Sequence, residues 1–107
     1  MTLTEITRYL NLDEAECLEI VQLFVAIGTE DLKILKDAIE KGDQRLALQK
    51  GHALKGSALN LGIRCIADNA EKIERLVRSD RTGDCSEALQ QLSDAMEHMT
   101  IVAGVKP

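Results

Sequence analysis

Apolar residues recur every three or four positions along most of the chain, which is the spacing of one face of an α-helix. The two clearest stripes are formed by Ile66, Ala70, Ile73 and Val77 and by Leu89, Leu92, Met96 and Met99. No alternation with a period of two is sustained, and the single proline, Pro107, is the last residue and interrupts nothing. The pattern therefore predicts an all-α protein.

Capping residues and polar breaks divide this pattern into helices. The predicted helices are a short one after Thr2, followed by helices over about 14–26, 30–41, 44–61, 64–78 and 86–99. Gly28 and Thr29 are predicted to break or kink the chain between the second and third helices. Because short loops between long helices favour antiparallel neighbours, we expect an up-and-down antiparallel four-helix bundle with a short additional N-terminal helix. Residues 1–107 are expected to form one domain.

The helix predicted to begin near residue 14 carries more apolar surface than a single core face needs. Its apolar residues between Cys17 and Ile27 spread over about 220° of a helical wheel, and one core face takes about half of that. Two explanations are open. Either the short first helix covers the remainder, or part of this face is a docking surface for a partner.

Charge and composition narrow the possible partners. The chain has a net charge of −5 and only two aromatic residues, Tyr9 and Phe24, so neither a phosphate-binding field nor a base-stacking surface is expected. We predict no nucleic-acid partner. No apolar run is long enough to span a membrane, and Glu5 and Arg8 interrupt the N-terminus where a signal peptide would be apolar. We therefore expect a cytoplasmic protein with no membrane association.

Cysteine and histidine usage indicates no metal or disulfide chemistry. The three cysteines, Cys17, Cys65 and Cys85, are odd in number, and no two have CxxC spacing. Reduced thiols are expected, with no metal site and no cofactor. No GxxxxGK[ST] or GxGxxG motif is present either, so autonomous kinase activity is not expected and the chain is predicted not to be an enzyme.

The segment 48–64 carries the most informative chemistry. On a helical wheel the buried stripe runs through Ala47, Leu54, Ala58 and Leu61, and His52 points about 160° away from Leu54. His52 is therefore predicted to be exposed in the middle of a long helix. Its neighbours one or two turns away are Leu48, Gln49, Lys55, Gly56 and Leu59.

A single function would account for His52 and the residues that surround it on the helix. A neutral imidazole is a nucleophile that can accept a phosphoryl group, and Lys55 would pair with the charge of that group. Gly56, which costs about 1 kcal/mol relative to alanine in a helix interior, would let a partner's backbone approach closely. Leu48, Gln49 and Leu59 would form a docking rim. The alternative is an exposed histidine of no consequence on a helix with incidental glycines.

The motif also resembles a known family. The run from His52 through Leu54, Lys55 and Gly56 to Ala58, followed by Gly62, is similar to the His-x-Leu-Lys-Gly-Ser/Ala signature of histidine-containing phosphotransfer (HPt) domains. The resemblance implies that His52 takes a phosphoryl group from an aspartyl phosphate on one receiver domain and passes it to an aspartate on another.

The resemblance also implies roles for the neighbouring residues. Lys55 matches the supporting cation and Gly56 the small residue beside the histidine. Family members often supply a further polar side chain from the next helix. Of the polar residues there, Glu71, Glu74 and Arg78, only Arg78 has the sign to support a phosphoryl group.

The same resemblance names the expected partners, which are response-regulator receiver domains, a hybrid histidine kinase, or both. Mg²⁺ is expected on the receiver and not on this chain, which is expected to be a monomer. Met1 and the set of helices favour a free-standing protein. The alternatives are an HPt-like domain of a larger sensor or chemotaxis-type histidine kinase, and a helical adaptor that is not phosphorylated.

Overall fold

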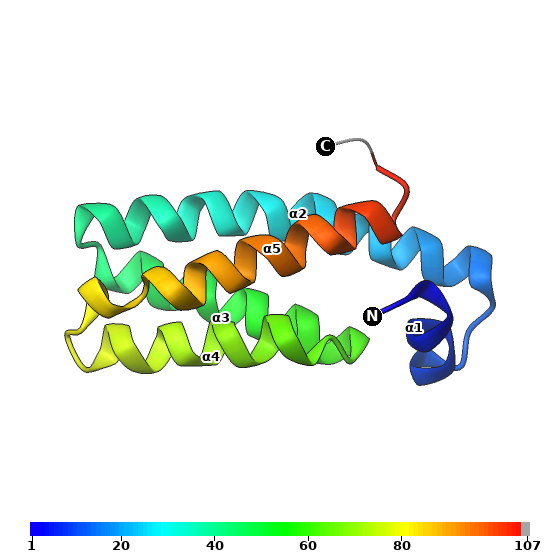
Figure 1. Cartoon of the computed structure of the whole chain (residues 1–107), viewed down its shortest axis with the longest axis horizontal. Helices are drawn as coiled ribbons and strands as arrows, with labels where there is room; N and C mark the ends of the chain where they lie inside the picture. The colour runs from blue at the N-terminus through cyan, green and yellow to red at the C-terminus, as the bar shows by residue number, and fades with distance from the viewer. Residues whose placement is uncertain (106–107) are drawn as a thin grey trace.

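The computed structural model describes residues 1–105, which are helical with short connections and contain no strand (Figure 1). The helices are α1 (Leu3–Leu10), α2 (Glu14–Lys41), α3 (Gln44–Leu61), α4 (Arg64–Arg78) and α5 (Ser86–Val102), with a short 3₁₀ turn, η1 (Thr82–Asp84), before α5. The prediction of an all-α protein is confirmed. Residues 106–107 of the predicted domain lie outside the described residues.

Local sequence signals set most of the helix boundaries. The side chain of Asp43 accepts a hydrogen bond from the backbone N–H of Leu46 at 3.1 Å and caps the start of α3. Gly42 and Gly62 end α2 and α3 with φ angles of 75° and 73°, in the left-handed region that glycine adopts without strain. The predicted boundaries of α3 and α4 are confirmed. They could be predicted because a capping residue acts on backbone groups within one turn of itself in the chain.

A break or kink was predicted at Gly28 and Thr29, and the break is wrong, because α2 continues without interruption from Glu14 to Lys41. Gly28 is buried, and a Cβ atom at this position would lie 2.8 Å from Cε of Met96 on α5 and 3.7 Å from Cδ2 of Leu54 on α3. The glycine therefore makes room for side chains of two other helices. It does not end its own helix.

The four long helices pack around a shared core. Helix α2 contacts α3 and α5, and α4 contacts the same two helices, so each long helix has two neighbours. Figure 1 shows α2 to α5 extended along the long axis of the molecule, with α1 at one end. The largest fully buried side chains are Ile6, Leu35, Leu54, Ile63, Ile66, Ile73, Leu92, Met99 and Glu74. Glu74 is the one acid among these otherwise apolar side chains. Within residues 1–105, no helix has an apolar stretch long enough to cross a membrane.

Helix α1 covers only part of the wide apolar face of α2. Ile6 of α1 is fully buried in the core, and the ring of Tyr9 lies against Gly62 at the end of α3. Farther along α2, however, Leu23 and Ile27 remain 61% and 51% exposed. The first explanation therefore holds for part of this face, and the part around Leu23 and Ile27 is left uncovered.

Candidate functional site

His52 lies in the middle of α3 on the side opposite the core. Its side chain is 71% exposed, whereas Leu54, two residues along, is 1% exposed. The exposure predicted from the helical wheel is confirmed. A histidine so placed has a ring that a partner protein can reach.

A buried carboxylate lies beneath this histidine. Glu74 of α4 has a side chain that is only 1% exposed, although α4 carries many solvated charges. Gly51 of α3 leaves the space it needs, because a Cβ atom at position 51 would lie 3.3 Å from Cγ of Glu74. Because Gly51 has no side chain, the Glu74 side chain can pack directly beneath His52.

Three basic groups surround the Glu74 carboxylate. Lys55 Nζ lies 3.0 Å from Oε1, Arg78 Nη2 lies 3.2 Å from Oε2, and His52 Nδ1 lies 3.6 Å from the same Oε2. Arg78 donates a hydrogen bond to Oε2 of Glu74. Lys55 forms an ion pair with Oε1, but this oxygen accepts no hydrogen bond from it. Burial of a carboxylate is unfavourable unless opposite charges offset it. The two cations supply that compensation.

The surroundings of Lys55 differ from those expected for a solvated lysine on an exposed helix face. Its side chain is 23% exposed and is held against Glu74. Arg78 is on the same carboxylate, one turn farther along α4, with its side chain 60% exposed. The structure therefore brings Lys55 and Arg78 together beside His52. Lysine and arginine together carry one more charge than the glutamate, so the site has a local positive excess in a chain of net charge −5.

The sequence alone indicates only that Glu74 is a polar position whose charge has the wrong sign for binding phosphate. A signal was nevertheless present, because Glu74 is one turn after Ala70 and next to Ile73, within the buried stripe of α4. An acid in such a stripe must have partners, since a buried charge without them is strongly unfavourable. The contact with His52 could not be predicted in this way, because it depends on how α3 and α4 are rotated against each other.

The predicted docking residues differ in accessibility. Gln49 is exposed and Leu59 is 42% exposed, whereas Leu48 is half-buried and packs against the core, so it offers less free surface than predicted. Gly56 is open, because no atom lies within 4 Å of the position that its Cβ would occupy. Packing within this chain therefore does not require a glycine at position 56.

A shallow hollow continues this surface from α3 to α2. Its volume is about 170 Å³, and its lining residues are Ile20, Leu23, Phe24, Ile27, Ser57, Asn60 and Leu61. It includes Leu23 and Ile27, the two large apolar side chains of α2 that α1 leaves uncovered. Apolar surface thus extends over α2 and α3 on the flank near Gly56.

Other reactive side chains lie away from this site. Nε2 of the second histidine, His98, lies 2.9 Å from the backbone oxygen of Met1 and fastens the N-terminus to α5. Cys17 and Cys85 are buried and Cys65 is exposed, all as free thiols. Burial, with a smaller contribution from Asp84, raises the pKa of the Cys85 thiol. Within residues 1–105, no three side chains of His, Cys, Asp or Glu form a group that could hold a metal ion.

Comparison with known families agrees with this geometry. The family model for the Hpt domain matches residues 19–100, from the second turn of α2 to near the end of α5. The chain therefore belongs to the Hpt domain family. Hpt domains take part in histidine phosphotransfer within phosphorelays, as phosphocarriers that interact with receiver domains and histidine kinases. No curated protein and no solved structure matches the chain.

Proposed function

We propose that this chain is a phosphorelay intermediate in which His52 accepts a phosphoryl group from a receiver aspartyl phosphate and passes it to another receiver aspartate. The observation that carries the proposal is the arrangement of the His52 ring. The ring is exposed, and its Nδ1 faces the buried Glu74 carboxylate at 3.6 Å. Nε2, on the opposite side of the ring, is then the nitrogen available to a partner.

Glu74 orients the nucleophile in this mechanism. A carboxylate next to Nδ1 favours the tautomer that carries its proton there, which leaves the lone pair on Nε2. At 3.6 Å the contact is too long for a hydrogen bond, and a small rotation of the exposed ring shortens it. Nε2 attacks phosphorus, the N–P bond forms, and the P–O bond to the aspartate breaks with its electron pair leaving on the carboxylate. The ring becomes positively charged, and Glu74 offsets that charge.

Lys55 and Arg78 stabilise the transferred group. Phosphoryl transfer depends mainly on positioning and on stabilising charge, so cations near the histidine favour it. Both side chains remain partly exposed at 23% and 60%, which allows their charged ends to turn toward a phosphoryl group on the ring. Glu74 keeps both cations close before the phosphoryl group arrives.

The receiver docks over Gly56 and the adjoining flank of α2 and α3. Leu23, Ile27 and Leu59 supply exposed apolar surface there, at 61%, 51% and 42%. Gln49 adds a polar rim, and Leu48 supports this surface from its half-buried position. A partly apolar interface of modest size suits a brief encounter between signalling proteins. In this proposal the chain acts as a monomer and a single up-and-down helical domain, and the receiver brings the Mg²⁺.

A phosphotransfer assay tests the proposal directly. The chain is incubated with a panel of phosphorylated receiver domains and, separately, with ATP alone. Acid-labile label should appear on the chain from at least one receiver and should not appear from ATP alone. Loss of that label in His52→Gln, with helicity unchanged by circular dichroism, supports His52 as the acceptor. Undiminished labelling of His52→Gln, or labelling of His98, would show that the site is elsewhere.

A further inference from the structure

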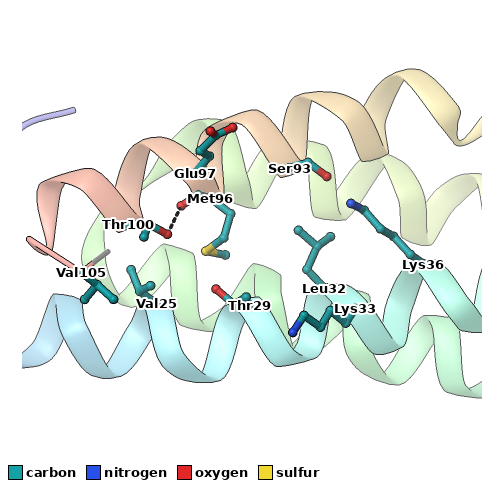
Figure 2. A pocket seen from close by; sticks show the side chains of 10 residues that line it. All are labelled: Val25, Thr29, Leu32, Lys33, Lys36, Ser93, Met96, Glu97, Thr100 and Val105. Atoms are coloured by element: carbon teal, nitrogen blue, oxygen red, sulfur yellow. Dashed lines mark hydrogen bonds between the residues drawn. The ribbon is translucent and has the colours of Figure 1, made fainter. Parts of the chain in front are cut away.

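A second concave site lies between α2 and α5, away from His52 and its partners. The pocket has a volume of about 420 Å³, within the range of about 300–1,000 Å³ typical of small-molecule sites (Figure 2). Its apolar surface is formed by side chains such as Val25, Leu32 and Met96. No residue of α3 or α4 lines it, so it is separate from the phosphotransfer site.

Ser93 is the first feature that points to a ligand with a polar group. Its Oγ atom is buried and forms no hydrogen bond with any residue from 1 to 105. Figure 2 shows the hydroxyl directed from α5 toward α2. A buried hydroxyl without a partner is unfavourable, and a ligand atom that accepts its hydrogen bond would remove that penalty.

Two lysines of α2 give the expected sign of that ligand's charge. Lys33 and Lys36 both line the pocket, and neither forms an ion pair with any of residues 1–105. In Figure 2, Lys36 extends toward the Ser93 end, whereas the carboxylate of Glu97 points from α5 away from α2. The end of the pocket near Ser93 therefore combines the Lys36 cation with a hydroxyl donor beside an apolar surface, and Lys33 adds a second positive charge to the α2 side of the pocket.

We infer that this pocket binds an amphipathic carboxylate, namely a medium-chain acyl carboxylate such as octanoate or decanoate. The carboxylate head lies beside Lys36, where it accepts the hydrogen bond of Ser93, and Lys33 adds positive charge along α2. The alkyl chain lies along Leu32 and Met96 toward Val25. The charge of the lysines favours an anion over an amine, and the apolar lining favours an alkyl chain over a small inorganic ion.

The direct test is an NMR titration of the isotope-labelled full chain with octanoate and then decanoate, both below their micelle concentrations. Amide shifts should move saturably around Leu32, Ser93 and Met96. Decanoate should bind about fifteenfold more tightly, since each buried methylene contributes about 0.8 kcal/mol. Octylamine, which has the opposite head charge, should bind more weakly than octanoate.

Charge variants separate this site from nonspecific alkyl binding. The double variant Lys33→Gln with Lys36→Gln should weaken octanoate binding about fivefold, the range expected for partly exposed ion pairs. Adding Ser93→Ala to the double lysine variant should weaken octanoate binding further. Lys72→Gln, which removes an exposed lysine of α4, is the matched control and should leave binding unchanged. His52→Gln should also bind octanoate normally, so this inference and the proposed phosphotransfer fail independently.

Three results would overturn the inference. The first is the absence of any saturable shift around Leu32, Ser93 and Met96 with either carboxylate. The second is equal binding by the parent and the double lysine variant, which would mean that the alkyl chain binds without recognition of the head. The third is a response of these residues only to rising protein concentration, which would identify the groove as a contact between copies of this chain.

Discussion

Nδ1 of His52 on α3 lies 3.6 Å from Oε2 of Glu74 on α4, although the histidine side chain is 71% exposed and the glutamate side chain only 1% exposed. The contact links a ring that a partner can reach to a carboxylate that the fold holds in place. Lys55 and Arg78 meet the same carboxylate from two further directions. Glu74 is thus the residue that assembles the site.

Glu74→Gln keeps the size of the side chain and removes its charge. We expect transfer to His52 to slow by about 10- to 150-fold, because a hydrogen bond to a charged group contributes about 1.5–3 kcal/mol. Single-turnover transfer from a phosphorylated receiver measures the rate, and ¹⁵N shifts of the imidazole nitrogens report the tautomer. Glu71→Gln, three residues earlier on the exposed side of α4, is the control. An unchanged tautomer and rate in Glu74→Gln would remove the positioning role.

Lys55→Ala should lower the free energy of unfolding by about 1–3 kcal/mol, because it leaves a buried carboxylate with one counterion fewer. The pair lies 3.0 Å apart, and the lysine side chain is 23% exposed, so solvent compensates only in part. Urea unfolding measures the change, with Lys72→Ala as the exposed control.

Combining Lys55→Ala with Glu74→Gln tests whether the ion pair between these two side chains accounts for the loss of stability predicted for Lys55→Ala. Once the carboxylate charge is gone, removing the lysine should have little further effect. Additive losses in the double variant would show that Lys55 acts on stability through some other contact.

The two glycines beside His52 should respond differently to the same substitution. Gly56→Ala should raise the free energy of unfolding by about 1 kcal/mol, since alanine is the better helix former and nothing lies within 4 Å of the new Cβ. Gly51→Ala should gain less, because its Cβ would lie 3.3 Å from Cγ of Glu74. Thermal or urea unfolding of both variants provides the comparison, and equal gains would contradict the tight approach of Glu74 to Gly51.

Gly56 also tests the docking surface. Gly56→Glu places bulk and a negative charge where we propose that the acidic receiver pocket docks. Transfer should slow while the bundle stays folded and His52 stays intact. Chemical-shift mapping with a cognate receiver locates the surface independently. Shifts confined to α4 and α5, with none around Gly56, Leu59 or Leu23, would place the docking face elsewhere.

The cysteines should differ in reactivity toward iodoacetamide near neutral pH. Only the thiolate reacts, and burial raises the pKa of Cys85, so this thiol should stay unmodified in the folded protein. Cys17 is buried as well, whereas Cys65 is exposed and should react first. Mass spectrometry of the native protein should find one modified cysteine, and three after denaturation. Rapid native modification of Cys85 would contradict its burial.

The raised pKa of Cys85 also predicts that the free energy of unfolding falls at alkaline pH. The folded state favours the neutral thiol, so this group stabilises folding fully below its ordinary pKa of 9.0. That contribution is lost as the pH rises above 9.0 through the higher pKa of the folded state. Cys85→Ala should therefore show a smaller loss of stability than the parent over this range, measured by urea unfolding at several pH values.

Features that depend on neighbouring residues within one helix could be predicted from the order of the amino acids alone. Periodicity predicted the all-α class, and Asp43 with Gly62 marked the ends of α3 because a cap acts within a single turn. The exposure of His52 followed from its angle to Leu54 on the same helix. The family resemblance also rested on a short contiguous segment, and the Hpt family match confirms it.

Contacts between side chains of different helices depend on tertiary packing and could not be predicted in this way. A break or kink was predicted at Gly28, yet α2 is continuous there, and the glycine makes room for Met96 of α5. One glycine disfavours a helix by about 1 kcal/mol, which burial of a single large side chain outweighs. Glu74 likewise became part of the site through the approach of α4 to Gly51. The rotation of one helix against another is set by packing over their whole length, so no local pattern around His52 could reveal its buried partner.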